Sequence, residues 1–277
     1  MNIGILHPGE MGVSVAVSAQ NSGNAVFWAS EGRSEKTRTC AERHGLTDAY
    51  SLVNLCKRCS IILSICPPHA AEDLARQVTH TGFKGLYVDA NAISPRRSVK
   101  IGEMIQGAGI DFVDGGIIGG PAWERGTTRL YLSGRRAEEI AACFANGLLE
   151  AKVIGEEIGK ASALKMCYAA YSKGTTALSS AILATAESNG VRDELYREWD
   201  LDEEGFSEQV NQRARRVTAK AWRFEGEMRE IAETFIEAGL PGGFHEAAME
   251  IFHRLAGFKE SSRQPELHEV LDALLRE

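Results

Sequence analysis

Short apolar segments rich in β-branched residues alternate with longer segments of helical periodicity along the first 150 or so residues. The short apolar segments are typical of strands that are buried on both faces. The expected strands are residues 3–6, 25–29, 60–65, 86–88, 110–114, 128–132 and 151–154. Helix-length patterns lie between them at residues 11–19, 34–44, 51–57, 70–79 and 96–108. βαβ units produce this alternation, so we expect a doubly wound, mostly parallel α/β sheet of the Rossmann type.

The pattern changes in the second half of the chain, where proline is absent from residues 122–240. Helix formers dominate residues 156–189, 207–238 and 243–257. The run over residues 159–187 would form a helix of about 30 residues and roughly 45 Å, long enough to leave one domain and enter the next. We therefore predict a sheet domain over residues 1–155 and an all-α domain over residues 156–277.

Composition and charge narrow the class of protein. The 277 residues are 44% apolar and 25% charged, which are the averages of globular proteins. A net charge of -7 argues against nucleic acid or an anionic membrane as a partner. The apolar segments are too short for a signal peptide or a membrane span, so we expect a cytoplasmic protein.

Six cysteines without a secretory signal are expected to be reduced thiols. Cys56 and Cys59 have a C-x-x-C spacing, but no second pair and no nearby histidine pair completes a tetrahedral zinc site. We therefore expect no metal centre.

A glycine-rich turn follows the first strand, and its residues are His7, Pro8, Gly9, Glu10, Met11 and Gly12. In dinucleotide-binding folds such a turn lets the backbone approach the pyrophosphate, and the following helix presents its N-terminal N–H groups. His7 replaces the first glycine of G-x-G-x-x-G, and it either contacts the pyrophosphate or only shapes the turn. The turn closes the first strand and a second strand follows at a βαβ distance, which favours a dinucleotide site over an ordinary turn.

The residues after the second strand determine whether a dinucleotide site prefers NAD or NADP. An acid there binds the ribose 2′-hydroxyl of NAD, whereas an arginine with small hydroxyl residues accepts the 2′-phosphate of NADP. Ser30, Arg33 and Ser34 favour NADP, and Glu31 favours NAD. We predict NADP, with NAD as the alternative. Arg33 could instead be a solvated charge at the start of a helix.

Lys165 lies on the long helix among small and apolar residues. Tyr168, Ala169 and Ser172 share its face by the three- and four-residue periodicity. A lysine with little solvation suits a general acid/base, whereas most helical lysines keep the ammonium in water. Spacing alone leaves both interpretations open.

Four motifs together resemble the β-hydroxyacid dehydrogenases, the superfamily of 6-phosphogluconate and 3-hydroxyisobutyrate dehydrogenases. The chain looks closest to a subgroup of NAD(P)-dependent oxidoreductases with its own helical C-terminal domain. The resemblance runs from residue 2 to about residue 190 and more loosely to about residue 260. Its motifs are HPGEMG at 7–12, SICPP at 64–68, VDANAISP at 88–95 with FVDGGIIGGPA at 112–122, and GKASALKM at 159–166.

The resemblance implies roles for individual residues. Lys165 matches the catalytic lysine, which exchanges the substrate hydroxyl proton while hydride moves between the hydroxyl-bearing carbon and the nicotinamide. Asn91 falls in the loop that meets the nicotinamide. Independently of the resemblance, Trp123 follows Gly119, Gly120 and Pro121 in the sequence, and it either lines the substrate pocket or packs on the sheet edge. The further cofactor positions are Cys66 and Pro67. The expected substrate positions are Gly119, Gly120, Trp123, Tyr168, Ala169 and Ser172.

Besides His7, three positions depart from the family. Ile118 stands where many members have a serine that helps hold the carboxylate, Ala92 replaces a usual hydroxyl residue, and Ala169 replaces an asparagine next to the substrate. A simple 3-hydroxyacid substrate is therefore in doubt.

Three hypotheses remain. The first is an NADP-preferring oxidoreductase acting on a hydroxyl or carbonyl of a small molecule, with Lys165 as general acid/base. The second is an imine reductase, a class that usually has Asp or Tyr in place of this lysine, in which Tyr168 could donate the proton. The third is a non-catalytic NADP-binding sensor. The family also implies a homodimer with an active site built between the two domains, sometimes from both copies.

Overall fold

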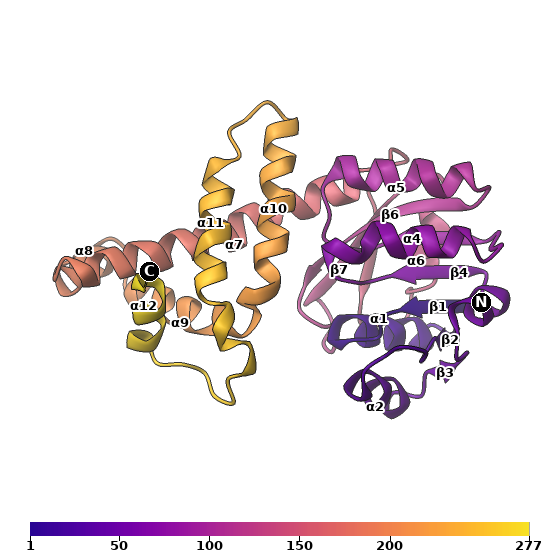
Figure 1. Cartoon of the computed structure of the whole chain (residues 1–277), viewed down its shortest axis with the longest axis horizontal. Helices are drawn as coiled ribbons and strands as arrows, with labels where there is room; N and C mark the ends of the chain where they lie inside the picture. Colours follow the sequence, from indigo (N-terminus) through magenta and orange to yellow (C-terminus); the bar gives the residue numbers. More distant parts are fainter. Residues whose placement is uncertain (277) are drawn as a thin grey trace. The chain divides into compact units, whose positions relative to one another are not determined.

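The computed structural model describes residues 1–276, and its first compact unit, Met1–Met166, is built around one eight-stranded sheet (Figure 1). The strand order is β3-β2-β1-β4-β5-β6-β7-β8, and every neighbouring pair is parallel except β6 and β7. The strands are β1 (Asn2–Leu6), β2 (Ala25–Trp28), β3 (Thr47–Asp48), β4 (Ile61–Ser64), β5 (Leu86–Asp89), β6 (Asp111–Gly119), β7 (Thr128–Ser133) and β8 (Glu150–Val153). The predicted fold class is confirmed.

Helices cover both faces of this sheet (Figure 1). They are α1 (Glu10–Asn21), α2 (Glu35–Arg43), α3 (Leu52–Arg58), α4 (Ala71–Thr79), α5 (Pro95–Gly107) and α6 (Ala137–Ala142), with a 3-10 turn η1 (Pro68–Ala70). Alternate residues of β4 enter different cores: Ile61 and Leu63 pack with α1 and α6, and Ile62 packs with α3, α4 and α5. Burial on both faces explains why the strands are continuously apolar in the sequence.

The sheet differs from the prediction in the length of β6. The expected strand over residues 110–114 extends to Gly119, because Gly115 and Gly116 continue the extended backbone rather than end it. β7 runs antiparallel to β6, since a short loop joins them and a parallel partner would need a crossover. β3, with two residues, and α6, with six, are too short to give a periodic signal.

The second compact unit begins at Cys167 and contains helices throughout its described part. α7 (Lys160–Ser188) starts in the first unit and continues into the second as one helix. The remaining elements are α8 (Arg192–Asp202), α9 (Phe206–Val217), η2 (Thr218–Lys220), α10 (Ala221–Glu237), α11 (Gly243–Arg254), η3 (Ala256–Glu260) and α12 (Leu267–Leu275). The two units divide inside α7, and the domain boundary after residue 155 stays a prediction.

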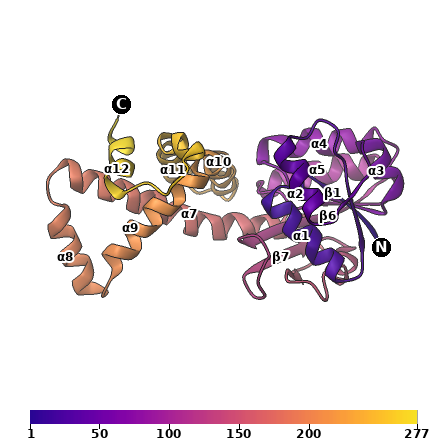
Figure 2. The same cartoon turned by 90° about the horizontal axis from the view of Figure 1, so that it is seen from below.

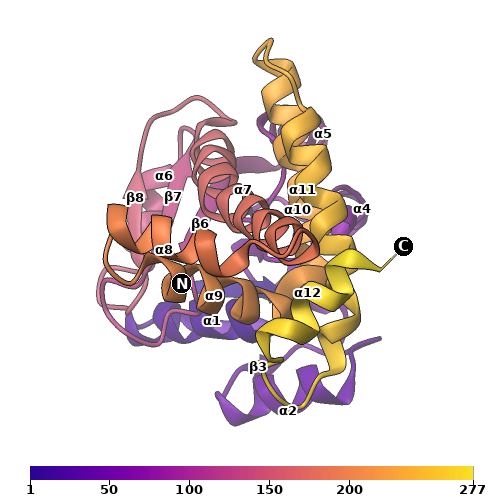
Figure 3. The same ribbon diagram turned by 90° about the vertical axis from the view of Figure 1, so that its left-hand side faces the viewer.

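α10 and α11 lie side by side as an antiparallel pair (Figure 3), and α8 leads into α9 through a turn (Figure 2). Residues 207–238, where helix formers dominate the sequence, form the two helices α9 and α10, which the 3-10 turn η2 divides. α8 and α12 were not predicted from the sequence. Among the described residues, no helix has both the length and the apolar character needed to cross a membrane.

Candidate functional site

The carboxyl ends of the four parallel strands β1, β2, β4 and β5 lie at one edge of the sheet. The chain leaves β1 toward β2 and β3, and it returns on the other side of β1 as β4. The strand order therefore reverses between β1 and β4, and doubly wound sheets generally bind ligands beyond the carboxyl ends of the strands at such a point. The predicted cofactor positions follow these strands: His7–Gly12 after β1, Ser30, Arg33 and Ser34 after β2, Cys66 and Pro67 after β4, and Asn91 after β5.

The turn after β1 keeps a glycine-like backbone although its first glycine is missing. His7 has a positive φ of 67°, a conformation in which glycine is common and histidine uncommon. Gly9 N donates to the carbonyl of His7 at 2.8 Å. A Cβ on Gly12 would lie 2.4 Å from that carbonyl oxygen, whereas a Cβ on Gly9 would have no atom within 4 Å. Gly12 is therefore required by the turn itself, and Gly9 leaves open space beside the start of α1.

Two buried nitrogen atoms beside this turn have no hydrogen-bond partner among the described residues: His7 Nδ1 and Arg33 Nε. Burial, and the nearby charge of Arg33, lower the pKa of His7 to about 4, and burial also lowers the pKa of Arg33. Buried polar groups normally find partners. The two nitrogens fit a ligand that brings acceptor oxygens, as the phosphates of a dinucleotide do.

The lowered pKa of His7 predicts a pH dependence of stability. The unfolded chain takes up a proton near pH 6.5, whereas the folded chain resists it until about pH 4, so the contribution of His7 is present above about pH 6.5 and is lost toward about pH 4. We expect the melting temperature of wild type to fall more than that of His7→Gly between about pH 7 and about pH 4.5. Glycine suits the positive φ at this position. His80→Asn, at an exposed histidine, is the control, and equal pH profiles for wild type and His7→Gly would contradict the assignment.

The hydroxyl of Ser34 begins α2: it accepts a hydrogen bond from Thr37 N at 3.3 Å. Ser30 is buried, and its backbone N donates to Asp48 Oδ1 at 3.2 Å. Of the residues after β2, Arg33 is thus the one with an unpartnered buried atom. The helix-capping role of Ser34 was not predicted, although a serine before a helical pattern is its ordinary signal.

Asn91 joins the ends of β4 and β5 from a buried position. Its Oδ1 accepts from Cys66 N at 2.5 Å, and its Nδ2 donates to Ser64 Oγ at 3.1 Å. Its own N donates to Asp89 Oδ1 at 3.0 Å. Burial raises the pKa of Asp89 to about 7, and burial together with Asp89 raises the pKa of the Cys66 thiol to about 12. Asn91 therefore shapes the edge where the nicotinamide is expected, and its direct contact with the cofactor stays a prediction.

Lys165 lies half-buried on α7 and donates from Nζ to the carbonyl oxygen of Ile117 in β6 at 2.5 Å. A Cβ on Gly116 would lie 2.5 Å from the carbonyl oxygen of Ala161 and 3.0 Å from Lys165 Cβ, so the glycine lets α7 lie directly against the strand. Gly119 ends the same strand with a φ of 121°. The structure thus brings Lys165 to the strand that leads into Gly119 and Gly120.

The other predicted substrate positions on α7 differ in exposure. Tyr168 is exposed, Ala169 is buried and Ser172 is half-buried, with its carbonyl accepting from Arg213 at 3.3 Å. All three continue the helix that carries Lys165. Their contact with a substrate stays a prediction.

Trp123 stacks on the ring of His44, with 5.1 Å between the ring centroids. His44 follows the last turn of α2, at the opposite end of that helix from β2. The neighbouring Ala122 N donates to Ser14 Oγ in α1 at 2.9 Å, which holds this loop on the helix layer. These contacts favour the packing role of Trp123, and its role toward a substrate stays a prediction.

Two buried acids were not predicted as parts of the site, Asp89 in β5 and Asp114 in β6. Both stand in the apolar motifs YVDAN and FVDGG. An acid inside a buried strand is costly unless donors surround it, and that cost is the signal that could have singled them out.

Cys56 and Cys59 are buried thiols, and burial raises the pKa of Cys59 to about 12. Such thiols are poor metal ligands and poor nucleophiles. Among the residues that the structure describes, no three His, Cys, Asp or Glu side chains form a metal-binding group.

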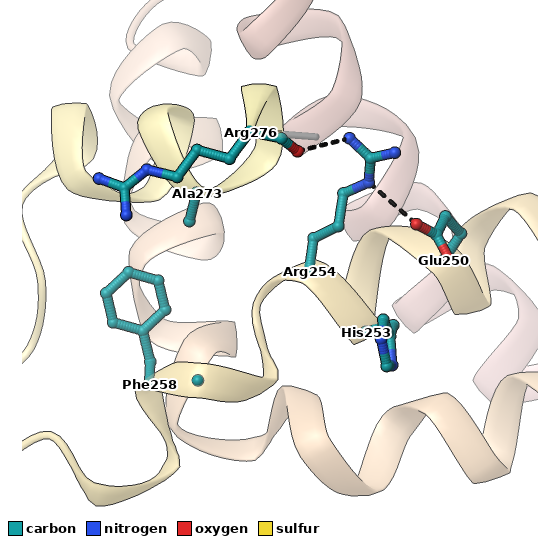
Figure 4. Close-up of a pocket in the computed structure, with 7 residues that line it drawn as sticks. Glu250, His253, Arg254, Phe258, Ala273 and Arg276 are labelled. Atoms are coloured by element: carbon teal, nitrogen blue, oxygen red, sulfur yellow. Dashed lines mark hydrogen bonds and ion pairs between the residues drawn. The ribbon is translucent and has the colours of Figure 1, made fainter.

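A cavity of about 590 Å³ lies within the second unit (Figure 4). Its Arg254 is already engaged, because it donates to Glu250 at 3.0 Å and to the carbonyls of Leu274 and Arg276 at 2.9 and 3.2 Å. None of the predicted site residues lines this cavity.

Two family models match the chain, one in its N-terminal half and one in its C-terminal half. Residues 2–146 match the family described as the NAD binding domain of 6-phosphogluconate dehydrogenase, and residues 186–255 match a domain of unknown function, DUF1932. An uncharacterized 28.5 kDa protein of Methanothermus fervidus is 33% identical over 165 residues, which are 60% of this chain and 63% of that protein. The alignment thus spans less than two thirds of that relative.

Solved structures share the fold over nearly the whole chain. A conserved protein of unknown function, described as structurally similar to 3-hydroxyacid dehydrogenases, is 28% identical with a TM-score of 0.70, covering 93% of this chain and 97% of that one. The 3-hydroxyisobutyrate dehydrogenase of Mycobacterium tuberculosis, solved with L-serine, is 15% identical with a TM-score of 0.70 and covers 99% of each chain. An imine reductase of Myxococcus stipitatus in complex with NADP+ is 18% identical with a TM-score of 0.58 and covers 100% of each chain.

Proposed function

The chain belongs to the family of the NAD binding domain of 6-phosphogluconate dehydrogenase, and we propose that it is an oxidoreductase that uses NADP in preference to NAD. Its reaction is hydride transfer between the nicotinamide and a hydroxyl- or carbonyl-bearing carbon of a small, 3-hydroxyacid-like molecule. The observation that carries this proposal is Lys165, a half-buried amine held 2.5 Å from the carbonyl of Ile117 on the strand that ends at Gly119.

The residues at the sheet edge fit the dinucleotide. The open space beside Gly9 leaves room for the pyrophosphate at the start of α1, and the unpartnered nitrogens of His7 and Arg33 supply donors. When bound, NADP supplies the hydride or accepts it. Residues His7–Gly12 and Arg33 hold its phosphates, and Asn91 keeps the ends of β4 and β5 in place beside it.

Lys165 transfers the proton that accompanies the hydride transfer. Oxidation of a hydroxyl group requires a base for the hydroxyl proton, and reduction of a carbonyl requires an acid for the new alkoxide. An amine at Lys165 performs both roles by accepting the proton at Nζ in one direction and returning it in the other. The bond to the Ile117 carbonyl orients Nζ for this transfer.

The preference for NADP predicts the effect of changing Arg33. A guanidinium paired with a phosphate contributes about 1.5–3 kcal/mol, so Arg33→Ala should raise the Kd of NADPH roughly 10- to 100-fold. The Kd of NADH should change little, because NADH has no 2′-phosphate. Titrations of intrinsic cofactor fluorescence measure both constants. Arg43→Ala, at the exposed last residue of α2, is the matched control, and equal losses for the two cofactors would contradict the assignment of Arg33.

Imine reduction is the second candidate, favoured by the exposed Tyr168 one turn after Lys165 and by the shared fold of the imine reductases. A third candidate is an NADP-binding sensor, which the alanine at Ala169 and the buried Ile118 favour. A panel of hydroxyacids, aldehydes and cyclic imines distinguishes them through the absorbance of NADPH. Turnover of carbonyls that depends on Lys165 supports the proposal. Turnover of imines that depends on Tyr168 supports the second candidate, and binding without turnover supports the third.

We further propose a homodimer with an active site completed by the second copy. Tyr168, Tyr171, Leu178 and Ile182 are exposed on α7 at intervals of three, seven and four residues, which places them along one side of the helix. An exposed apolar stripe of this kind is typical of an interface between copies.

Light scattering after size exclusion should therefore give twice the chain mass of 30.1 kDa. Leu178→Glu should shift the protein toward the monomer, because it buries a charge in the interface. Glu204→Lys, in the exposed turn between α8 and α9, is the control that should leave the mass unchanged. A wild-type monomer at micromolar concentration would contradict the dimer.

A further inference from the structure

Asp114 lies in the middle of β6 and is fully buried. A buried carboxylate is costly unless donors surround it, and five hydrogen bonds do so here. Oδ1 accepts from Ser98 Oγ at 2.9 Å and Ser162 Oγ at 2.6 Å, and Oδ2 accepts from Ser133 Oγ at 3.1 Å, Gly159 N at 3.0 Å and Ser162 N at 3.0 Å. Three elements around the strand therefore converge on one side chain.

Most of these donors belong to the beginning of α7. The first N–H groups of a helix have no acceptor within the helix, and Gly159, the residue before α7, has no side chain to serve as a cap. Asp114 accepts from Gly159 N and Ser162 N instead. Ser133 Oγ accepts from Ala161 N at 3.1 Å and itself donates to Asp114. A carboxylate from the sheet thus caps the helix, at the end where the helix dipole favours negative charge.

A second contact fixes the same helix three residues further along β6, where the carbonyl of Ile117 accepts from Lys165 Nζ. Ser162 and Lys165 are one helical turn apart and share a side of α7. Between the two contacts, a Cβ on Gly116 would lie 2.5 Å from the carbonyl oxygen of Ala161. The helix therefore lies on the strand backbone, with a polar anchor on each side of the closest approach.

We infer that Asp114 is a positioning residue for Lys165. It sets the rotation and the height of α7 on β6, and so holds Lys165 Nζ at the Ile117 carbonyl. A slip by one residue would turn the helix by about 100° and move it by about 1.5 Å. A displacement of about 1 Å at a reacting group costs on the order of a hundredfold in rate. The importance of this placement for turnover rests on the proposed function, whereas the placement itself does not.

Trace acetylation followed by mass spectrometry tests the placement without a substrate. The reaction rate of each lysine is measured as a function of pH in wild type and in Asp114→Asn, which puts an amide donor where the backbone N–H groups need an acceptor. We expect the rate at Lys165 to rise about tenfold and its pH profile to move, because Nζ leaves the Ile117 carbonyl. Lys152, exposed in β8 and paired with Glu150, is the internal control and should not change.

Activity gives the second readout. With a substrate in hand, Asp114→Asn should lower kcat about a hundredfold while the Kd of NADPH stays at the wild-type value. Asp111→Asn is the matched control on the same strand, since Asp111 is exposed and pairs with Arg136. It should leave both quantities unchanged.

Ser162→Ala covers the case in which Asp114→Asn does not fold. It removes one hydroxyl donor and keeps the carboxylate, so the acetylation rate of Lys165 should rise about two- to threefold. Wild-type rates and pH profiles at Lys165 in the folded variants would overturn the inference. If the profile of Lys165 changes but wild type turns over no substrate, the positioning role stands and the proposed function fails.

Discussion

Replacing Lys165 by alanine should lower turnover about a thousandfold and leave the affinity for NADPH unchanged. General acid/base groups contribute about 10²- to 10⁴-fold to a rate, and the proton transfer assigned to Nζ has no substitute in an alanine side chain. The lysine contacts the carbonyl of Ile117 in β6, and none of the turn residues His7–Gly12 is changed by the substitution. Steady-state rates and fluorescence titration of NADPH, made on the same preparations, measure the two quantities.

Lys160→Ala is the matched control for this experiment. Lys160 begins the same helix, is exposed, and pairs with Glu157 at 3.3 Å, an exposed ion pair of little energetic consequence. Its loss should leave turnover within about twofold. Full activity in Lys165→Ala would show that the lysine does not transfer the proton. An equal loss of NADPH affinity would show that the lysine binds the cofactor instead of acting as general acid/base.

Gly9→Ala should weaken NADPH binding roughly 10- to 100-fold without destabilising the protein. Gly9 has extended backbone angles that any residue adopts, and no atom lies within 4 Å of a Cβ at this position. The added methyl group would therefore occupy only the space that the pyrophosphate needs. Thermal denaturation of the protein without cofactor, with fluorescence titration of NADPH, separates the two effects.

Gly12→Ala provides the contrast, because its Cβ would lie 2.4 Å from the carbonyl oxygen of His7. Overpacking of this kind costs about 1–3 kcal/mol, so this variant should lose stability before any cofactor is added. Wild-type affinity for NADPH in Gly9→Ala would show that the cofactor does not approach this turn.

The sheet domain could be predicted from the sequence because its strands are buried on both faces and therefore continuously apolar. The apolar residues of the helices that cover the sheet recur with a period of about 3.6 residues. The same rule explains what could not be predicted. β6 continues through Gly115 and Gly116, which carry no hydrophobic signal, and the 3-10 turn Thr218–Lys220 divides α9 from α10 where neither proline nor glycine marks a break.

The candidate site was predictable as a set of positions along the chain but not as a set of contacts. The strand ends that gather His7, Arg33 and Asn91 follow from the topology of a parallel sheet. The positive φ of His7 does not, because histidine seldom adopts it. The two hydrogen bonds that commit the Asn91 side chain do not either, since their partners lie 25 and 27 residues away in the sequence. The cap that Asp114 places on α7 is of the same kind, with partners up to 48 residues distant.

Transfer of deuterium tests the central claim most directly. NADPH that carries deuterium at the transferable position of the nicotinamide is incubated with wild type and the panel of carbonyl compounds and imines, and the products are analysed by mass spectrometry. The proposed function predicts deuterium on the former carbonyl carbon of at least one product, and labelling about a thousandfold slower when Lys165 is replaced by alanine. NADPH that binds but never passes deuterium to any compound would contradict an oxidoreductase and leave a nucleotide-binding protein.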